Sequence, residues 1–291
     1  MYKNLLSKFK YFLLIGRYDK PHGALLLMWP CFWGAAYAND LSLELIKFLF
    51  LFFLGSFVMR GAGCTINDII DVKYDRKVER TKNRPLASKK INKTEAIFFL
   101  IFQLILGLLV VVNFSMKVIF LSFAIIPFVF LYPFVKRITF FPQLFLGFIF
   151  NWGILIGYFS LNNEFNIGIF YLYFAGVFLT LGYDTIYGFQ DINDDRKIGV
   201  KSLSIRIKDN YKKSLGLIYT FSWIFFLFSH FSASTIKKES IIYLILIMLH
   251  MIYQIKKLNI KNQIDLKNTF NSNVILGFVI FLGIFFNNFF F

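Results

Sequence analysis

Cysteine, histidine and acidic residues are all scarce in this sequence of 291 residues. Its two cysteines, Cys31 and Cys64, lie near apolar segments and provide neither a disulfide framework nor the ligand spacing of a zinc site. Its three histidines are scattered and form no ligand cluster. The sequence also lacks a P-loop, a dinucleotide-binding fingerprint, an HExxH zinc pair and a nucleophile with an adjacent base. These absences exclude the common nucleotide-binding, zinc-hydrolase and covalent-catalysis classes.

Basic residues outnumber acidic ones two to one, with 32 Lys and Arg against 16 Asp and Glu and a formal net charge of +16. On one face of a soluble domain, such an excess would indicate nucleic-acid binding. Here, however, 57% of the residues are hydrophobic and 21% are aromatic, and the runs 96–114 and 118–135 contain no charged residue. Both runs match the roughly 20 residues that cross a hydrocarbon core of about 30 Å. We therefore expect an integral protein of the lipid bilayer, with no nucleic-acid partner.

Hydropathy predicts an all-α membrane protein, a bundle of nine transmembrane helices in a single domain of residues 1–291. Asn, Gly and Pro residues separate the apolar runs. The basic and partly amphipathic segment 1–20 precedes them and is expected to lie on the membrane surface. The nine predicted spans are 22–38, 42–64, 94–112, 117–135, 142–161, 167–187, 214–232, 238–255 and 270–290.

The distribution of Lys and Arg predicts the orientation of these spans. Segments on one side of the membrane carry 27 of the 32 basic residues, which the positive-inside rule assigns to the cytoplasm, together with the N-terminus. No cleavable signal peptide is apparent, and the lack of an Arg- and Ser-rich leader favours the bacterial inner membrane over the mitochondrial one. The predicted cytoplasmic segments are 1–21, 65–93, 136–141, 188–213 and 256–269.

The first of two acidic stretches, residues 67–86, reads NDIIDVKYDRKVERTKNRPL. If its first half is helical, Asn67, Asp71 and Asp75 recur every four residues and share one face, with Asp68 beside them. Like charges stacked in this way repel one another, so they make sense where divalent cations lie between them. Basic residues directly downstream suit phosphate groups. The stretch therefore predicts a site for a diphosphate and its metal ions.

A second stretch, residues 184–202, reads DTIYGFQDINDDRKIGVKS and repeats this design. Asp191 and Asp195 have the same four-residue spacing, and Asp184 and Tyr187 are predicted to share their helical face. The two stretches together contain eight of the sixteen carboxylates. Both follow spans that end on the predicted cytoplasmic side, so we expect the active site on that side of the membrane.

A solvated loop of mixed charge is the simpler explanation for one such stretch, but two with the same spacing on the same side argue against it. Asp184 also lies within an apolar run, where an ionisable group indicates a functional site. The short basic loop 133–139 fits two explanations equally well: anchoring at the membrane surface, and binding of an anion by Arg137. Arg17, just before the first span, has the same two explanations.

At this point the sequence resembles the UbiA superfamily of intramembrane prenyltransferases. Residues 67–85 match that family's signature NDxxDxxxDxxxxRTxxRP, and residues 184–202 match its second signature DxxYxxxDxxxDxxxGxKS. The nine-helix bundle of the family agrees with the predicted span count. Within the superfamily, RYDKPHGALLLMWPCFW (residues 17–33) and YPFVKRITFFPQLFLG (residues 132–147) resemble the 4-hydroxybenzoate polyprenyltransferase branch of ubiquinone biosynthesis.

The resemblance implies transfer of a polyprenyl group from polyprenyl diphosphate to the ring of 4-hydroxybenzoate, ortho to its hydroxyl, with Mg²⁺ as cofactor. Asp191, Asp184 and Arg137 are the implied catalytic residues, and Arg137 and Tyr187 would bind the aromatic substrate. The implied metal-binding residues are Asn67, Asp68, Asp71, Asp75, Asp191 and Asp195. The diphosphate-binding residues are Arg80, Arg84, Lys201 and Arg17.

Two alternatives stay open. The first is another branch of the superfamily, such as a haem O synthase, a menaquinone or homogentisate prenyltransferase, or a chlorophyll synthase. The second is a cation-coupled transporter that uses the acidic residues as ion ligands. Transport sites usually lie near the middle of the bilayer, whereas these acidic residues are predicted at the ends of the spans and beside many basic residues.

Overall fold

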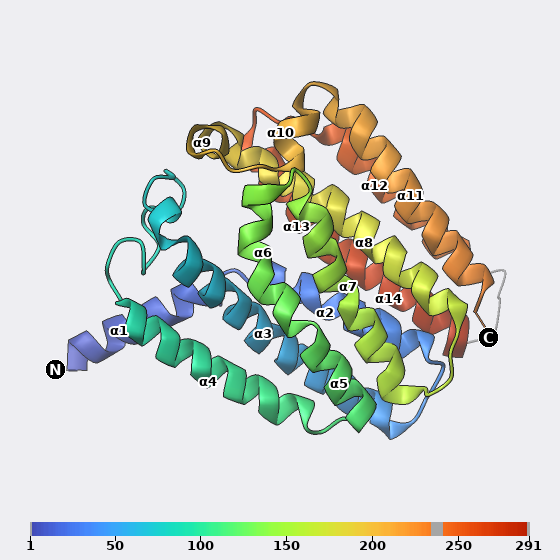
Figure 1. The fold of residues 1–291 in the computed structure, drawn as a ribbon. Coiled ribbons are helices and arrows are strands. Elements are labelled where there is room, and N and C mark those ends of the chain that lie inside the picture. The colour runs from blue at the N-terminus through green and yellow to red at the C-terminus, as the bar shows by residue number, and fades with distance from the viewer. Residues whose placement is uncertain (1, 234–240, 290–291) are drawn as a thin grey trace.

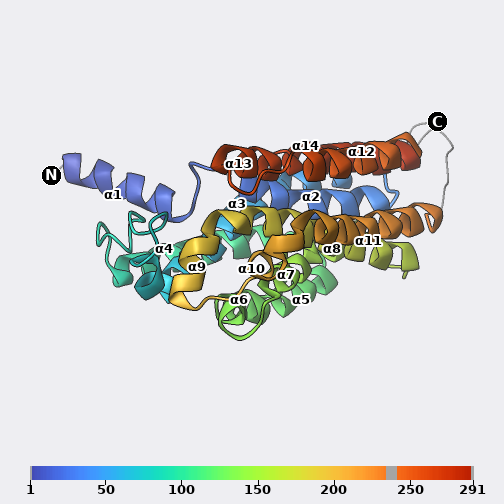
Figure 2. The ribbon, with the colours of Figure 1, turned by 90° about the horizontal axis from the view of Figure 1, so that it is seen from above.

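The computed structural model describes residues 2–233 and 241–289, and within them the chain forms helices and no strand. Most helices run alongside one another in an elongated bundle (Figure 1). Seen from above, α12, α13 and α14 line one side of the bundle and α5 and α6 line the other (Figure 2). The α-helices are α1 (Tyr2–Ile15), α2 (His22–Tyr37), α3 (Leu43–Asp75), α4 (Lys93–Val111), α5 (Met116–Ala124), α6 (Ile126–Ile138), α7 (Pro142–Leu161), α8 (Ile167–Gly188), α9 (Ile192–Ile198), α10 (Leu203–Ile207), α11 (Tyr211–Phe231), α12 (Ile241–Lys257), α13 (Gln263–Asn271) and α14 (Asn273–Phe289); η1 (Phe189–Asp191) and η2 (Lys208–Asn210) are short 3₁₀ helices.

The outer surface of the bundle is apolar. Large side chains such as Phe98, Phe120 and Ile46 are each more than 60% exposed, and lipid covers such surfaces in a protein whose backbone groups are satisfied within helices. The chain is therefore a multi-pass membrane protein. Within the described residues, seven helical segments are long and apolar enough to cross a bilayer: Leu43–Asp75, Lys93–Val111, Met116–Ile138, Pro142–Leu161, Ile167–Ile198, Leu203–Phe231 and Gln263–Asn288.

These seven segments coincide with seven of the nine predicted spans. The other two predicted spans correspond to α2 and α12, which have 16 and 17 residues in the described part of the chain. Residues 238–240, where the eighth predicted span begins, and residue 290, where the ninth ends, lie outside the described residues. The sequence analysis ended the second span at residue 64, whereas α3 continues as one helix to Asp75.

Two glycines bring the backbones of α2 and α7 into direct contact. A Cβ atom on Gly34 would lie 2.0 Å from the carbonyl oxygen of Ile154, and one on Gly157 would lie 2.0 Å from the carbonyl oxygen of Cys31. Small residues allow such close approach between helices in membranes, where packing replaces the hydrophobic effect as the source of association. The centre of the bundle therefore depends on these two positions.

Replacing Gly157 by Ala is expected to lower the melting temperature of the purified protein. The added methyl meets backbone, which cannot rotate away, and overpacking of this kind costs about 1–3 kcal/mol. Gly216→Ala is the matched control, because nothing lies within 4 Å of a Cβ at that position in α11 and Ala is the better helix former. Thermal unfolding followed by circular dichroism compares the two variants. Equal melting temperatures would contradict the close contact between α2 and α7.

The two acidic stretches lie at the same end of the bundle. The last turns of α3, the loop of residues 76–92, the end of α6 and the short helices α9 and α10 gather there (Figure 1). This end also contains the start of α4 and the end of α1. The spans thus hold residues from distant parts of the chain around one polar region.

Candidate active site

The last three turns of α3 supply three buried carboxylates. The helix carries Asp68, Asp71 and Asp75 at spacings of three and four residues, which place them on one face. Their exposed fractions are 1%, 1% and 8%. This confirms the helical spacing predicted for the first acidic stretch. Buried carboxylates of this kind require cationic or hydrogen-bonding partners.

The loop of residues 76–92 covers these carboxylates by folding back along α3. The Arg76 guanidinium donates a hydrogen bond to the carbonyl oxygen of Ala87 at 3.1 Å, and the Thr81 hydroxyl donates to the carbonyl oxygen of Asp75 at 2.9 Å. Leu86 and Ile91 of the same loop are buried against the end of α1. The hydrogen bonds of Arg76 and Thr81 therefore hold the loop in its folded-back form beside α3, and its buried apolar residues fix it against α1.

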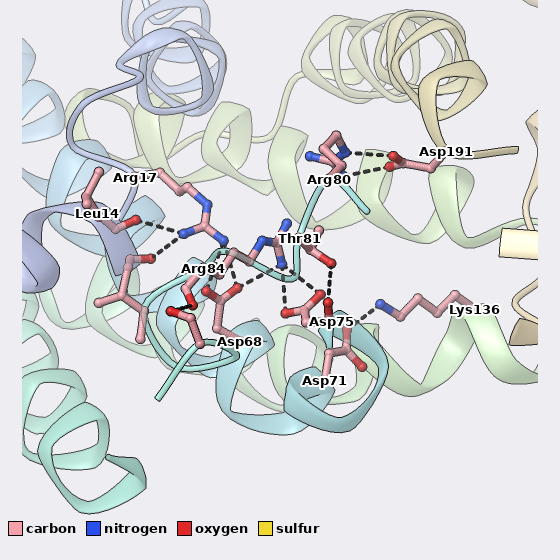
Figure 3. A network of polar contacts seen from close by, with 12 residues as sticks. Leu14, Arg17, Asp68, Asp71, Asp75, Arg80, Thr81, Arg84, Lys136 and Asp191 are labelled. Atoms are coloured by element: carbon pink, nitrogen blue, oxygen red, sulfur yellow. Dashed lines mark hydrogen bonds and ion pairs between the residues drawn. The ribbon is translucent and has the colours of Figure 1, made fainter. Parts of the chain in front are cut away.

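Two arginines neutralise Asp68 and Asp75 (Figure 3). Arg17 donates to both carboxylate oxygens of Asp68, at 2.8 and 3.0 Å. Arg84 donates to Asp68 at 3.0 Å and to the two oxygens of Asp75 at 2.9 and 3.1 Å. Charge-assisted hydrogen bonds of this geometry are the strong ones, and Arg84 joins two carboxylates through one guanidinium.

Asp71 has two partners from the end of α6. The ammonium group of Lys136 pairs with one carboxylate oxygen, and Arg137 donates to the other at 3.1 Å. Arg137 also lies over the ring of Tyr74, with its guanidinium carbon 4.7 Å from the ring centroid. The short loop between the fourth and fifth predicted spans therefore reaches the first acidic stretch directly.

Arg80 connects the two acidic stretches. It donates to both oxygens of Asp191, each at 2.6 Å, and to the hydroxyl of Tyr187 at 3.2 Å. Burial alone would lower the pKa of the Arg80 guanidinium, but the hydrogen bonds to Asp191 and the nearby Tyr187 raise its pKa above the ordinary value. The backbone N–H of Glu79 also donates to Asp194 at 3.3 Å. The sequence analysis proposed that both stretches form one site, and these contacts bring them together.

The sequence analysis assumed that the second acidic stretch forms a single helix, but the structure shows an interrupted one. Its helix α8 ends at Gly188, η1 follows, and α9 begins at Ile192, so the predicted continuous helix is interrupted between Asp184 and Asp195. Asp191 nevertheless interacts electrostatically with both Asp184 and Asp195. The chain bends where it packs tightly against α10: a Cβ on Gly188 would lie 2.4 Å from the hydroxyl oxygen of Ser204. The bend leaves Asp191 at the junction, where Arg80 meets it.

Among the predicted phosphate-binding residues, Lys201 alone pairs with no carboxylate of the described part of the chain. It follows Gly199, whose φ of +73° lies in the left-handed region that glycine readily adopts. The turn directs the Lys201 ammonium to the carbonyl oxygen of Ile138 at 3.0 Å, and its backbone N–H to the carbonyl oxygen of Lys136 at 2.8 Å. Lys201 thus ties this stretch to the end of α6.

The predicted metal-binding residues fit a hard divalent cation by their chemistry. All six offer oxygen atoms, and the side-chain oxygen of Asn67 is buried with no hydrogen-bond partner among the described residues. In the described part of the chain no three acidic, His or Cys side chains converge closely enough to form a metal cluster. Four of the carboxylates, Asp68, Asp71, Asp75 and Asp191, instead pair with Arg and Lys side chains (Figure 3). A bound cation would therefore replace these partners.

Comparison with known families gives a match to the UbiA prenyltransferase family over residues 27–286. The chain belongs to the UbiA prenyltransferase family. The match extends over nearly all of the described helices and includes both acidic stretches. Within the family, the chain is similar to curated proteins along most of its length, and to solved structures at lower identity.

Two curated relatives illustrate this similarity. The chain is 40% identical over 296 residues to the mitochondrial 4-hydroxybenzoate polyprenyltransferase of Drosophila melanogaster, with 97% of this chain and 72% of the relative covered. It is 39% identical over 285 residues to 4-hydroxybenzoate geranyltransferase 1 of Lithospermum erythrorhizon, with 93% of this chain and 88% of the relative covered.

Solved structures of the family have the same fold. The apo structure of a UbiA homologue from Aeropyrum pernix superposes with a TM-score of 0.74 at 20% identity and covers 89% of this chain and 96% of its own. A UbiA homologue from Archaeoglobus fulgidus bound to DMAPP and Mg²⁺ superposes with a TM-score of 0.69 at 18% identity, and covers 93% of this chain and 99% of its own.

Arg60 and Lys136 are two site residues that the sequence analysis missed. Arg60 lies two turns before Asn67 on α3, interacts electrostatically with Asp184, and has a buried Nε without a hydrogen-bond partner. The principle that drew attention to Asp184, a charged residue inside an apolar span, applies equally to Arg60. Lys136 gave no such signal, because a lysine at the end of a span is also the ordinary mark of membrane orientation.

Proposed function

We propose that this chain transfers a polyprenyl group from polyprenyl diphosphate to the ring of 4-hydroxybenzoate, ortho to the hydroxyl, in ubiquinone biosynthesis. The observation that carries the proposal is the 40% identity, over 97% of the chain, to a 4-hydroxybenzoate polyprenyltransferase. The contact of Arg80 with Asp191 supports it, because one site then has carboxylates from both acidic stretches. Residues 1–291 would form a single transmembrane prenyltransferase domain.

At the diphosphate end, two sets of side chains have complementary tasks. Asn67, Asp68, Asp71, Asp75, Asp191 and Asp195 would hold Mg²⁺. When bound, Mg²⁺ supplies positive charge that stabilises the diphosphate as a leaving group. Arg17, Arg80 and Arg84, which now pair with carboxylates, would then pair with phosphate oxygens. We also retain Lys201 as a phosphate ligand, which requires its ammonium group to leave the carbonyl of Ile138.

The transfer itself breaks the bond between the allylic carbon and the diphosphate oxygen, and forms a bond between that carbon and the ring. The bond electrons leave with the diphosphate, and the ring carbon ortho to the hydroxyl attacks the resulting allylic cation. The ring then loses a proton, for which Asp191 or Asp184 is the proposed acceptor. The apolar helices around the site keep water from the cation.

Two arginines are candidates for the carboxylate of the aromatic acid. The sequence analysis chose Arg137, whose guanidinium is already bonded to Asp71 and lies over Tyr74. Arg60 has stronger support, because its guanidinium donates to the neutral Sγ of Cys64 rather than to a carboxylate, and its Nε is enclosed without a partner among the described residues. It also lies within electrostatic range of Asp184 and Tyr187, the residues proposed to act on the ring. Tyr187 would contact the ring itself.

For the topology, we propose nine spans with the N-terminus and the active site on the basic, cytoplasmic side, where α2 and α12 supply the two further spans. The segregation of Lys and Arg supports this orientation. The bacterial inner membrane is part of the proposal, although relatives such as the Drosophila protein are named mitochondrial and give it no support.

A membrane assay with polyprenyl diphosphate and radiolabelled 4-hydroxybenzoate tests the function. We expect label in the lipid phase that disappears when EDTA removes the metal.

Arg60→Met is expected to raise the KM for 4-hydroxybenzoate by about 10²-fold, the value of a lost charged hydrogen-bond pair, with Arg137→Met as the matched comparison. Product with homogentisate or haem alone would indicate another branch of the family. No product with any acceptor, combined with cation flux, would indicate the transporter.

A further inference from the structure

Helix α1 lies outside the bundle of spans. It slants away from α3 and α4 at the end of the molecule that holds the active site, and the N-terminus projects from the bundle (Figures 1 and 2). One side of α1 meets the protein: Ile15 is fully buried, and the rings of Phe12 and Phe99 lie 5.0 Å apart. Lys8 adds an ion pair of 2.5 Å with Glu95. The helix is thus attached along its second half.

The opposite side of α1 is apolar and meets no other part of the described chain. Phe9 is 62% exposed and Leu13 is 39% exposed, and their spacing of four residues puts them on one face. The helix contains three lysines and no acidic residue, and Lys10 is exposed. An apolar face with lysines beside it is typical of a helix that lies in the headgroup layer of a membrane. The helix lies at the polar end of the bundle, where a bilayer crossed by the spans would end (Figure 1).

The end of α1 is joined directly to the active site through Arg17. Its backbone has a φ of 59°, in the left-handed region that residues other than glycine seldom adopt. Its guanidinium donates to the carbonyl oxygens of Leu14 and Ile15 at 2.8 and 3.3 Å, and at the same time to Asp68 at 2.8 and 3.0 Å (Figure 3). Arg17 therefore holds the last turn of α1 against a carboxylate of the site. A shift of α1 would move this guanidinium.

We propose that α1 is an interfacial anchor, whose apolar face of Phe9 and Leu13 inserts among anionic lipid headgroups and so holds Arg17 beside the carboxylates, within reach of the diphosphate. Lipid charge would then act on the site from outside: anionic headgroups attract the lysines of α1, and the anchored helix fixes the position of Arg17. Arg17 is a positioning residue in its contact with α1. Loss of the lipid contact should therefore weaken binding of the diphosphate and leave the rate of the chemical step nearly unchanged.

The membrane contact can be tested without catalysis. A nitroxide attached to Phe9→Cys in nanodiscs of anionic phospholipid is compared with two references: Asp209→Cys, an exposed polar position, and Leu217→Cys, an apolar position of α11 that is 61% exposed. We expect the label at residue 9 to be more accessible to oxygen than to a water-soluble nickel complex, as at residue 217. A label that behaves as at residue 209 would overturn the proposal.

The link to the site rests on the proposed function and has its own test. The double substitution Phe9→Gln with Leu13→Gln is expected to raise the KM for polyprenyl diphosphate roughly five- to tenfold in anionic nanodiscs, with kcat nearly unchanged. The reason is that Arg17, no longer held by an anchored α1, binds the diphosphate more weakly. The control is Leu217→Gln with Phe221→Gln, the same residue types at the same spacing on α11, which should leave KM unchanged. Wild-type protein moved to zwitterionic lipid should resemble the α1 variant. Equal KM values for the two double variants would overturn the link, and absence of activity in the wild type would count against the proposed function alone.

Discussion

The substitution Asp71→Asn is expected to reduce kcat for prenyl transfer by about 10³-fold, which corresponds to roughly 4 kcal/mol of activation free energy. The side chain keeps its size but loses its charge at a position that is 1% exposed. The change replaces a carboxylate, a proposed metal ligand, by a weaker neutral amide ligand and leaves Lys136 and Arg137 without their common anionic partner. Turnover of 4-hydroxybenzoate at saturating Mg²⁺ measures the effect.

The control for this experiment is Asp209→Asn, which removes the same charge from an exposed position in η2. Its turnover should stay within about twofold of the wild type, because isolated surface charges have small effects. Melting temperatures of both variants separate lost catalysis from lost folding. Turnover within tenfold of the wild type in folded Asp71→Asn would show that Asp71 does not bind the metal.

For Asp191→Ala we expect a fall in kcat/KM of about 10²–10³-fold, since its carboxylate is proposed to act at the centre of the reaction. The variant also breaks the two 2.6 Å hydrogen bonds from Arg80 that join the acidic stretches. Asp194→Ala is the matched control, three residues further along the chain. Among the described residues, Asp194 accepts a hydrogen bond from the N–H of Glu79 and has a 3.9 Å contact with Lys197.

The comparison separates the position of a carboxylate from the charge of the segment. Both variants remove one negative charge from η1 and α9, so a general electrostatic effect would lower activity equally in both. We expect Asp194→Ala to retain activity within about threefold of the wild type, as for other partly exposed charges. Similar losses in the two variants would assign the effect to net charge and remove Asp191 from the list of catalytic residues.

The helices of this protein could be predicted from hydropathy because lipid imposes one requirement on every span, a long apolar run with all backbone groups bonded internally. Their polar ends could not be predicted as well. Charged residues follow residue 64, so hydropathy predicted that the second span ends there. The helix α3 nevertheless continues to Asp75, because its carboxylates are paired with basic side chains. The helix break after Gly188 lies where the backbone passes close to Ser204 of α10, a tertiary contact that no local pattern records.

In the site, the sequence predicted which residue types meet but not which pairs form. Spacing along one helix placed Asp68, Asp71 and Asp75 together, because it depends only on helix geometry. The pairing of Asp71 with Lys136 and of Asp68 with Arg17 depends on the tertiary arrangement. Each arginine and lysine had several carboxylates within reach along the chain, and only the packed bundle selects among them.

The length of α3 relates the active site to bilayer thickness. Its 33 residues rise about 1.5 Å each, or roughly 50 Å in all, whereas the hydrocarbon core measures about 30 Å. If α3 crosses the membrane as proposed, its surplus turns place Asp68, Asp71 and Asp75 beyond the acyl chains, on the same continuous helix. A thicker membrane would draw these carboxylates toward the headgroups, and a thinner one would raise them into water. Through hydrophobic mismatch, we therefore expect activity to depend on bilayer thickness. The carboxylates must lie at a depth that both the water-soluble acid and the lipid-soluble prenyl chain can reach.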